Sequence, residues 1–528
     1  MRFFLFSLSL SLSFSSLSAL GADTMQGRTI EAESLNHLRS SNFNVSKTEA
    51  GFDYVGHIDD SSILCYDNID MSGVRSIEFV YARGPGAYET GRVAVLVSPL
   101  NGLGKRTNLG EFETADTGDW ETFQSQRVGL TKPPGGRHSL CFFGITGGGI
   151  FNLDKFTLSS QPGENLVITK TFADALPGVL GGAGYRFELE VVGEAANEIW
   201  SMAFLPDGGI VAAQKNGYLA LFQDGKQSAL IEGLPDVWNR GQGGLMAVQP
   251  HPEYPKNGWL YLSYSHGNSE GKAMTVVARG KIAGQRWQNH EIIYQAPDEF
   301  YSESNSHFGS RLVFKDGYIF FSVGERVDQD KAQDLGSPLG KIHRLHDDGR
   351  VPNDNPFVET EGALASIWSY GHRNPQGITL SPDGKHVWAV EHGPRGGDEL
   401  NLILKGRNYG WPLVSFGTNY DGTLISESPW LEGIEPPVQQ WTPSLGVSQA
   451  VFYTGGQFPL WRNQLLVASL GQQQLRMVKL DNNNQLVSDT LILQNLGRIR
   501  DVVSGPDGYP YLVISHPYGK IYRLKPAK

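Results

Sequence analysis

Between residues 368 and 412, the chain carries several side chains suited to binding within a short stretch of sequence. They form an Arg–Asn–Pro–Gln run, a Gly–Pro turn, an acidic residue and a tyrosine: Arg373, Asn374, Gln376, Gly393, Pro394, Glu399 and Tyr409. Arginine presents a planar fork of donors that matches anionic oxygens. Backbone carbonyls and carboxylates are the ligands that a hard cation prefers. The segment therefore predicts a site for an anionic organic molecule together with a metal ion.

Three residues outside this segment could act at the same site. His307 has an imidazole, whose ordinary pKa of about 6.5 lets it accept a proton near neutral pH. Arg498 and Arg500 alternate along an expected strand, so both side chains can point to one side and bind carboxylates. The alternatives are a structural histidine and two surface arginines on an edge strand.

The elements that position these residues follow from length and composition. A chain of 528 residues exceeds one ordinary core, so two or more domains are expected. A formal charge of −11 argues against a nucleic-acid partner, because phosphate binding requires a basic face.

The first residues are typical of a targeting signal. Arg2 precedes an apolar, Ser-rich run that ends in small residues, which predicts a cleaved signal peptide over 1–22 and an exported protein, periplasmic or secreted. A membrane anchor is the alternative. Export makes a disulfide between the two cysteines, Cys65 and Cys141, plausible, with two buried thiols as the alternative.

Two all-β domains are expected. Residues 27–160 contain short alternating runs between Gly, Asp and Pro turns, which favours a β-sandwich of the jelly-roll type, and a polar linker follows. Residues 166–528 repeat Asp-Gly turns between apolar runs, for example at 205–209, 315–318, 381–385 and 505–509. This repetition favours a β-propeller, with a large sandwich or a solenoid as the alternatives.

The first domain resembles a family 6 carbohydrate-binding module. The resemblance rests on IEAESLN (30–36), FDYVGHIDD (52–60), the GDWETF region (118–123) and GIFNLDKFTL (149–158). It implies a structural calcium at Glu31, Glu33 and Asp154, and a sugar-binding cleft with Trp120, Asn152 and Tyr54. The alternative for the two aromatic residues is a place in the core.

The second domain resembles the soluble aldose sugar dehydrogenases that use pyrroloquinoline quinone. The matching segments are 239–265, NSHFGSRLVF (305–314), the segment between 368 and 412, and GRIRDVVSGPDGY (497–509). The resemblance covers about 200 to 525 and implies a six-bladed propeller with the quinone and Ca²⁺ as cofactors.

The resemblance also implies a role for each candidate. His307 would be the base, Gln242 would bind the sugar, and Arg373 would stabilise charge on the quinone. The cofactor would contact Arg373, Asn374, Gln376, Ser444, Arg498 and Arg500. The carbonyls of Gly393 and Pro394 would bind the active-site Ca²⁺, and Glu399 and Tyr409 would belong to a second, structural calcium.

Three positions depart from this pattern. Gly471 stands where the family carries a cofactor-reaching Lys, Ala247 replaces an acidic residue, and residues 445–449 read LGVSQ where Ile–Ala–Pro–Ser–Gly is usual. The predicted function is oxidation of aldoses or oligosaccharide reducing ends at C1 to lactones, tethered to polysaccharide by the first domain. A non-catalytic carbohydrate-binding propeller and a calcium-dependent lactone hydrolase are the alternatives. The sequence does not name the electron acceptor.

Overall fold

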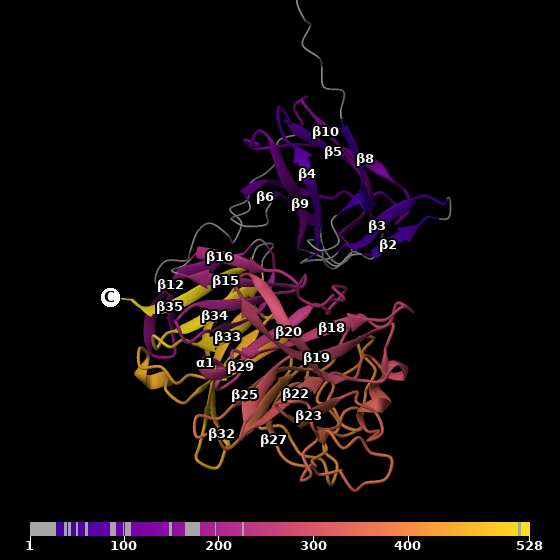
Figure 1. Cartoon of the computed structure of the whole chain (residues 1–528). Helices are drawn as coiled ribbons and strands as arrows, with labels where there is room; N and C mark the ends of the chain where they lie inside the picture. The colour runs from indigo at the N-terminus through magenta and orange to yellow at the C-terminus, as the bar shows by residue number, and fades with distance from the viewer. Residues whose placement is uncertain are drawn as a thin grey trace, which may run out of the picture.

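A computed structural model of the chain describes residues 28–35, 40, 44–48, 51–58, 62–84, 91–98, 100, 107–146, 150–163, 180–195, 197–223, 226–515 and 519–527. The predicted signal segment lies outside these residues. The described chain forms a smaller β-domain, drawn above a larger one in Figure 1. No helix in the described ranges is long and apolar enough to cross a membrane.

The N-terminal domain is a sandwich of two antiparallel sheets. One has the order β2 (Asn44–Lys47), β3 (Asp53–Ile58), β10 (Phe151–Ser159), β5 (Ser76–Ala82) and β8 (Gln124–Gly129), with β1 (Arg28–Glu31) also paired to β10. The other has the order β4 (Ile63–Asp70), β9 (Arg137–Thr146), β6 (Arg92–Ser98) and β7 (Thr107–Glu113). A short 3-10 turn, η1 (Ala32–Ser34), follows β1.

Aromatic packing holds the sandwich together. The buried rings of Phe79, Phe142 and Phe156 lie between the sheets, with the centroids of Phe79 and Phe142 4.8 Å apart. Cys65 and Cys141 face each other on β4 and β9 and form the disulfide that the sequence made plausible. The aromatic core therefore holds the two sheets together, and the disulfide links two neighbouring strands within one of them.

The larger domain is a propeller, and the described residues contain six successive sheets. The first three blades are β13 (Ile199–Phe204), β14 (Ile210–Gln214), β15 (Tyr218–Gln223) and β16 (Lys226–Ile231); β17 (Leu245–Pro250), β18 (Leu260–Gly267), β19 (Ala273–Ala283) and β20 (Arg286–Gln295); and β21 (Leu312–Lys315), β22 (Tyr318–Val323), β23 (Lys341–His346) and β24 (Ile367–Tyr370). Helical turns occur at α1 (Tyr254–Asn257), η2 (Asp298–Phe300) and η3 (Gln329–Ala332).

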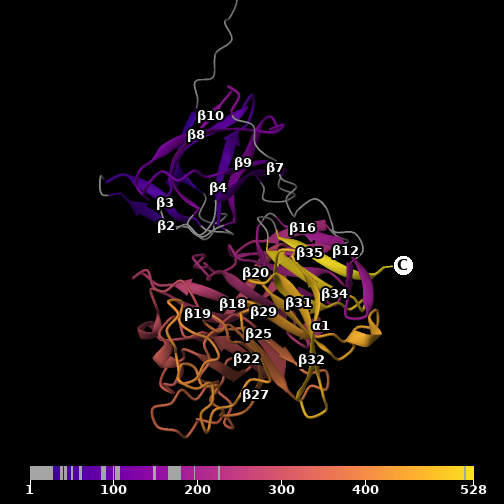
Figure 2. The same cartoon turned by 180° about the vertical axis from the view of Figure 1, so that it is seen from behind.

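The last three blades complete the ring. They are β25 (Pro375–Leu380), β26 (Val387–Glu391), β27 (Asp398–Ile403) and β28 (Gln439–Trp441); β29 (Val447–Phe452), β30 (Leu465–Ser469), β31 (Gln474–Leu480) and β32 (Leu486–Gln494); and β33 (Arg498–Ser504), β34 (Pro510–Ser515) and β35 (Lys520–Pro526), with β12 (Tyr185–Glu194) and β11 (Leu180–Gly182). The turn η4 (Pro459–Trp461) lies in the fifth blade. The sixth blade joins both ends of the domain, since β12 pairs with β35 (Figure 2).

The Asp-Gly turns behave as the sequence indicated. Those at 205–209, 315–318, 381–385 and 505–509 each join the first and second strands of a blade. Gly208 and Gly508, for example, have φ values of 86° and 82°, a left-handed conformation that glycine adopts without steric cost. These turns lie at one face of the ring, and the opposite face is formed by the connections between second and third strands and between successive blades.

A repeated irregularity marks the innermost strands. In five blades the pairing of the first strand shifts after its first or second residue, which is the signature of a β-bulge. The residues skipped by the pairing are Trp200, Met246, Gln376, Ser448 and Arg500. A bulge re-aims a side chain, so the fold presents one such residue from each of these blades at the same level of the ring.

Candidate active site

The predicted residues gather at the face opposite the Asp-Gly turns. Gln242, His307, Arg373, Ser444 and Arg498 lie at or just before the start of a blade's first strand. Gly393 and Pro394 lie in the loop between the second and third strands of the fourth blade. Because each blade is an antiparallel meander, these two kinds of position lie at the same end of the strands.

His307 has a carboxylate partner that the sequence did not indicate. Its Nδ1 lies 2.7 Å and 2.9 Å from the two carboxylate oxygens of Glu325, which is buried. A carboxylate only accepts, so Nδ1 carries the hydrogen and Nε2 keeps a lone pair. Burial lowers the pKa of His307, and the charges of Arg373 and Arg326 act in the same direction against the opposing effect of Glu325. The ring is therefore neutral at neutral pH, with Nε2 able to take a proton.

Gln242 lies beside this base. Its Oε1 accepts a hydrogen bond from the backbone N–H of His307 at 2.9 Å, and the residue as a whole is exposed. His307 has a φ of 55°, a left-handed conformation that costs energy for a residue with a side chain. Gln242 thus helps to hold the left-handed backbone of His307.

Asn374 and Gln376 support the same loop from below. The Oδ1 of Asn374 accepts from the backbone N–H of Gly309 at 3.1 Å, and the Nε2 of Gln376 donates to the carbonyl of Gly309 at 3.0 Å. Both side chains are buried. Asn374 and Gln376, which were predicted to contact the cofactor, therefore also fix the loop that carries His307.

Arg373 is buried next to the loop of the fourth blade. Its Nη1 donates to the carbonyl of Gly393 at 2.9 Å, and its backbone N–H donates to Glu391 at 2.8 Å. The Nε of Arg373 is buried and has no hydrogen-bond partner in the described part of the chain. A buried donor of this kind calls for an acceptor, and an anionic ligand would supply one.

Ser444 closes the loop that contains Gly393 and Pro394. Its hydroxyl accepts from the backbone N–H of Gly396 at 3.1 Å and donates to the carbonyl of Pro394 at 3.3 Å. Each of the two carbonyls predicted to bind Ca²⁺ therefore accepts one hydrogen bond, from Arg373 or from Ser444. A carbonyl oxygen has a second lone pair, which leaves room for a cation.

Glu399 lies directly opposite Glu391 on neighbouring strands. Asn401 donates to both carboxylates, at 3.0 Å and 2.9 Å. Burial raises the pKa of Glu399 to about 8, and the charge of Glu391 adds to this shift. Glu399 lines a small pocket together with Gly393 and Tyr409.

The phenol hydroxyl of Tyr409 is hydrogen-bonded to the backbone at the end of β27. Its hydroxyl donates to the carbonyl of Leu402 and accepts from the N–H of Leu404 at 2.8 Å. Among the described residues, no group of three or more His, Cys, Asp or Glu side chains is arranged to hold a metal ion. A cation at this pocket would therefore depend on backbone carbonyls as well as on Glu399.

Arg500 and Arg498 begin the first strand of the sixth blade. The guanidinium of Arg500 lies 4.0 Å from the ring centroid of Trp200, and its Nη2 is 3.5 Å from a carboxylate oxygen of Glu198. Ser515 donates to the same carboxylate at 2.6 Å. Burial lowers the pKa of Arg500 to about 10, so it remains charged at neutral pH.

Gly471 occupies a tight position. A Cβ added there would meet the carbonyl oxygen of Leu445 at 3.0 Å, and the N–H of Gly471 packs against Gly446. Two of the three departures from the family pattern therefore lie against each other, the turn at 445–446 and Gly471. Ala247, the third departure, is buried on β17.

The predicted cleft residues of the sandwich lie together. The Nδ2 of Asn152 donates to the carbonyl of Trp120 at 2.8 Å, and a Cβ added to Gly56 would meet both Asn152 and Tyr54 at 2.8 Å. Trp120 and Tyr54 are partly exposed, and Trp120 packs on the backbone of Gly84. Neither aromatic is therefore enclosed in the core.

The predicted calcium residues of the sandwich surround a lysine. The Nζ of Lys155 lies 3.1 Å from Asp154, and the charges of Glu31 and Glu33 also raise the pKa of Lys155, after the larger effect of Asp154. One carboxylate oxygen of Glu33 is buried with no hydrogen-bond partner in the described ranges. A lysine thus lies nearest to the carboxylate positions assigned to calcium.

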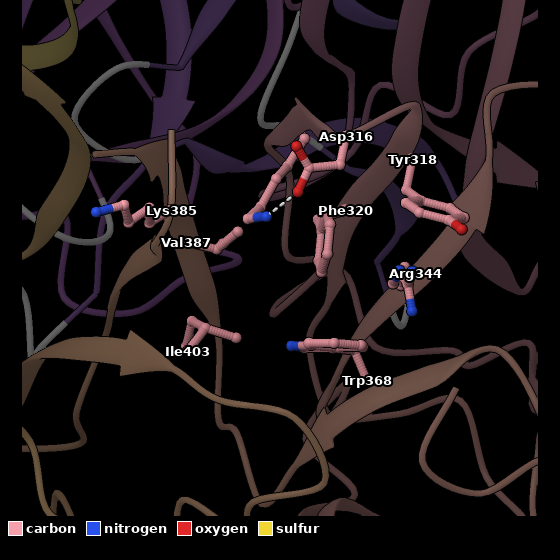
Figure 3. A pocket seen from close by; sticks show the side chains of 9 residues that line it. Asp316, Tyr318, Phe320, Arg344, Trp368, Lys385, Val387 and Ile403 are labelled. Carbon is pink, nitrogen blue, oxygen red and sulfur yellow. Dashed lines mark hydrogen bonds and ion pairs between the residues drawn. The ribbon is translucent and has the colours of Figure 1, made fainter. Parts of the chain in front are cut away.

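A second pocket lies at the opposite end of the propeller, between the third and fourth blades (Figure 3). Arg344 stacks between Tyr318 and Trp368, at 3.7 Å and 4.8 Å from their ring centroids. Lys315 and Lys385 also line the pocket, and Lys385 lies across it from Trp368. It contains none of the residues predicted from the sequence.

These features define a six-bladed propeller with a histidine–carboxylate pair, two buried arginines and a carbonyl-rich loop at one face. Residues 196–523 match the family described as Glucose / Sorbosone dehydrogenase, and residues 31–160 match the family 6 carbohydrate-binding module. The chain belongs to the Glucose / Sorbosone dehydrogenase family, and it carries a family 6 carbohydrate-binding module before its dehydrogenase domain.

Individual relatives agree with this assignment. The aldose sugar dehydrogenase YliI of Escherichia coli is 39% identical over 66% of this chain and 96% of its own length. Quinoprotein glucose dehydrogenase B of Acinetobacter calcoaceticus is 26% identical over 55% of this chain and 77% of its own length. The crystal structure of the soluble aldose sugar dehydrogenase from Escherichia coli, in its apo form, covers 65% of this chain and all of its own, with a TM-score of 0.62.

The comparisons confirm the predicted family, the predicted class of enzyme and the predicted all-β fold with a sandwich and a propeller. A structure of an aldose sugar dehydrogenase from Streptomyces coelicolor with bound PQQ is 24% identical and has a TM-score of 0.53, which supports the fold alone. The roles predicted for single residues stay predictions.

Proposed function

We propose that this protein is an exported quinoprotein that oxidises aldoses, or the reducing ends of oligosaccharides, at C1 to lactones. The observation that carries the proposal is the His307–Glu325 pair beside a buried Arg373 whose Nε has no partner among the described residues. A neutral base next to a buried cation is an arrangement suited to removing a proton while negative charge develops nearby.

The residues present fit pyrroloquinoline quinone. Its carboxylates call for fixed cations, and Arg498 and Arg500 lie at the start of β33 on the same face as His307. Arg373 would donate to a quinone oxygen, and Asn374 and Gln376 would lie at the ring edge, with Ser444 at the neighbouring loop. When bound, the quinone supplies the two-electron acceptor for hydride.

The chain's own groups perform the remaining steps. Gln242, at the exposed entrance, would hydrogen-bond the sugar next to His307. His307 Nε2 takes the proton of the C1 hydroxyl while the C1 hydrogen leaves with its electron pair, so that C1 and oxygen form the lactone carbonyl. Glu325 stabilises the imidazolium that results. An external electron acceptor must then remove the two electrons.

Ca²⁺ is part of the proposal. The pocket of Glu399, Gly393 and Pro394 offers carboxylate and carbonyl oxygens, and a cation there would favour the ionised form of Glu399 beside Glu391, against the raised pKa of Glu399. The carboxylates of Glu31, Glu33 and Asp154 are the corresponding proposal for the sandwich. The partly exposed Trp120 and Tyr54 beside Asn152 support binding of polysaccharide there.

Reconstitution tests the function directly. The purified protein is incubated with pyrroloquinoline quinone and CaCl₂, and dye reduction is followed with a panel of aldoses and oligosaccharides. His307→Ala is the informative variant, and His290→Ala, which changes an exposed histidine on β20, is its control. If the wild type forms lactone and His307→Ala forms it at the same rate, the base is assigned wrongly. No dye reduction with any sugar, despite bound quinone, would refute the function.

A further inference from the structure

We propose that Lys215 supplies the cofactor-binding amine that Gly471 lacks, and so binds a carboxylate of the cofactor from the other side of the sixth blade. This inference rests on the proposed function. Three features of the described chain support it: the place of Lys215 in the ring, its packing with Arg500, and the carboxylate on which their charges converge.

The place of Lys215 mirrors that of Gly471. Lys215 directly follows β14, the second strand of the first blade, and Gly471 follows β30, the second strand of the fifth. These two blades flank the sixth, which carries Arg498 and Arg500, and both β13 and β29 pack against β33. A lysine in either loop therefore lies at the same face and at the same level, next to the two arginines.

Trp200 brings Lys215 and Arg500 together. The indole of Trp200 is buried, and its ring centroid lies 5.8 Å from the Nζ of Lys215 and 4.0 Å from the guanidinium of Arg500. The Nζ of Lys215 also donates to the carbonyl of Gly241 at 2.7 Å. The amine is therefore fixed between the arginine cluster and the loop that carries Gln242.

Glu198 shows that the surroundings favour a carboxylate. Burial raises the pKa of this group, but Arg500, Lys215, Ser515 and Arg498 together lower it below its ordinary value. Burial lowers the pKa of Lys215 to about 8, while Glu198 acts to keep it charged. A cluster that keeps a buried carboxylate ionised can do the same for a carboxylate of a ligand.

The alternative is that Lys215 has a purely structural role, in which its hydrogen bond to Gly241 only links the loop that contains Gly241 to the first blade. The two possibilities differ in what a substitution does. Lys215→Gln keeps a donor for the Gly241 carbonyl and removes the charge, whereas Lys215→Arg keeps the charge. A structural amine predicts no change in cofactor affinity for either variant once the protein is folded.

The test is a fluorescence titration of each protein with pyrroloquinoline quinone in the presence of CaCl₂ and without sugar. We expect Lys215→Gln to raise Kd at least tenfold, which corresponds to about 1.4 kcal/mol. Lys215→Arg stays within threefold of the wild type. Lys385→Gln, a change of an exposed lysine at the opposite end of the propeller, leaves Kd unchanged.

A second variant tests whether charge is the reason. Gly471 has no left-handed φ, and a Cβ there would lie 3.0 Å from the carbonyl oxygen of Leu445, so the facing turn must shift by a few tenths of an ångström to admit a side chain. Gly471→Lys in the Lys215→Gln background then restores an amine from the fifth blade. Recovery of most of the lost affinity supports the proposal. An unchanged Kd in Lys215→Gln, or no recovery in a double variant with normal thermal unfolding, overturns it. A wild-type protein that binds no quinone overturns the proposed function itself.

Discussion

Glu325 offers the sharpest test of how the base works. Its carboxylate lies 2.7 Å from the Nδ1 of His307 and also accepts from the N–H of Val327 at 2.8 Å. Glu325→Gln keeps the shape and an accepting oxygen but removes the charge. The loop therefore stays folded, while the imidazolium that forms during proton transfer loses its counter-charge.

The magnitude follows from the kind of bond. A hydrogen bond to a charged group contributes about 1.5–3 kcal/mol, so kcat on the pH plateau should fall by a factor of roughly 10 to 150. The pH profile moves in a defined direction. Glu325 raises the pKa of His307 against the larger effect of burial, so its removal lowers that pKa further. The base then stays neutral to lower pH, and the acidic limb of kcat/KM shifts to lower pH.

The assay is a pH–rate profile of the reconstituted enzyme with one aldose, wild type against Glu325→Gln. Glu303→Gln, which changes an exposed carboxylate between η2 and the same loop, is the matched control. A plateau unchanged from the wild type, or an acidic limb shifted to higher pH, would refute the reasoning. Either result would mean that Glu325 neither orients the imidazole of His307 nor stabilises its protonated form.

Four further changes have defined outcomes. His307→Ala should lower kcat by about 10²–10⁴-fold, with quinone binding retained in an absorbance titration; loss of binding instead would make His307 a cofactor ligand. Chelation of Ca²⁺ should lower the melting temperature of the wild type in calorimetry, and this calcium-dependent shift should shrink in Glu399→Gln but not in Glu427→Gln; equal shifts would place the ion elsewhere. Cys65→Ser with Cys141→Ser should destabilise the sandwich by roughly 4 kcal/mol in the loop-closure account, seen as a lower first transition in calorimetry, and an unshifted transition would contradict it. Trp120→Ala should lower retention in gels that contain polysaccharide, whereas Trp430→Ala, an exposed tryptophan of the propeller, should not; equal retention of both would remove the platform role.

The sequence predicted the architecture because the signals are local. An Asp-Gly turn needs only its own residues, and Gly208 and Gly508 adopt the left-handed φ that such turns require. The cysteine pair was accessible because no other cysteine competes. The role of His307 was predicted only through the motif around it.

The partners of the site residues were not accessible in the same way. Glu325 and Lys215 each follow the second strand of a blade, and they reach the site because the ring brings these loops to one face. The sequence separation of Glu325 from His307, or of Lys215 from Arg500, does not indicate that the two residues lie close together. An alignment of the blades with one another could have found them. It would have placed Glu325 and Lys215 in the loop after the second strand, the kind of loop that also contains Gly393 and Gly471.

The shared sixth blade has a consequence for the closure of the ring. The strands β33 to β35 follow the other five blades in sequence, and they complete their sheet with β12 and β11, which precede all five of those blades. Arg498 and Arg500 lie on β33, so the carboxylate-binding end of the site does not exist until the ring has closed. On the proposed function, a propeller that lacks β33, or whose two ends have separated, would therefore lose this end of the cofactor site. By linkage, a cofactor that binds only the closed ring would also stabilise the closed ring.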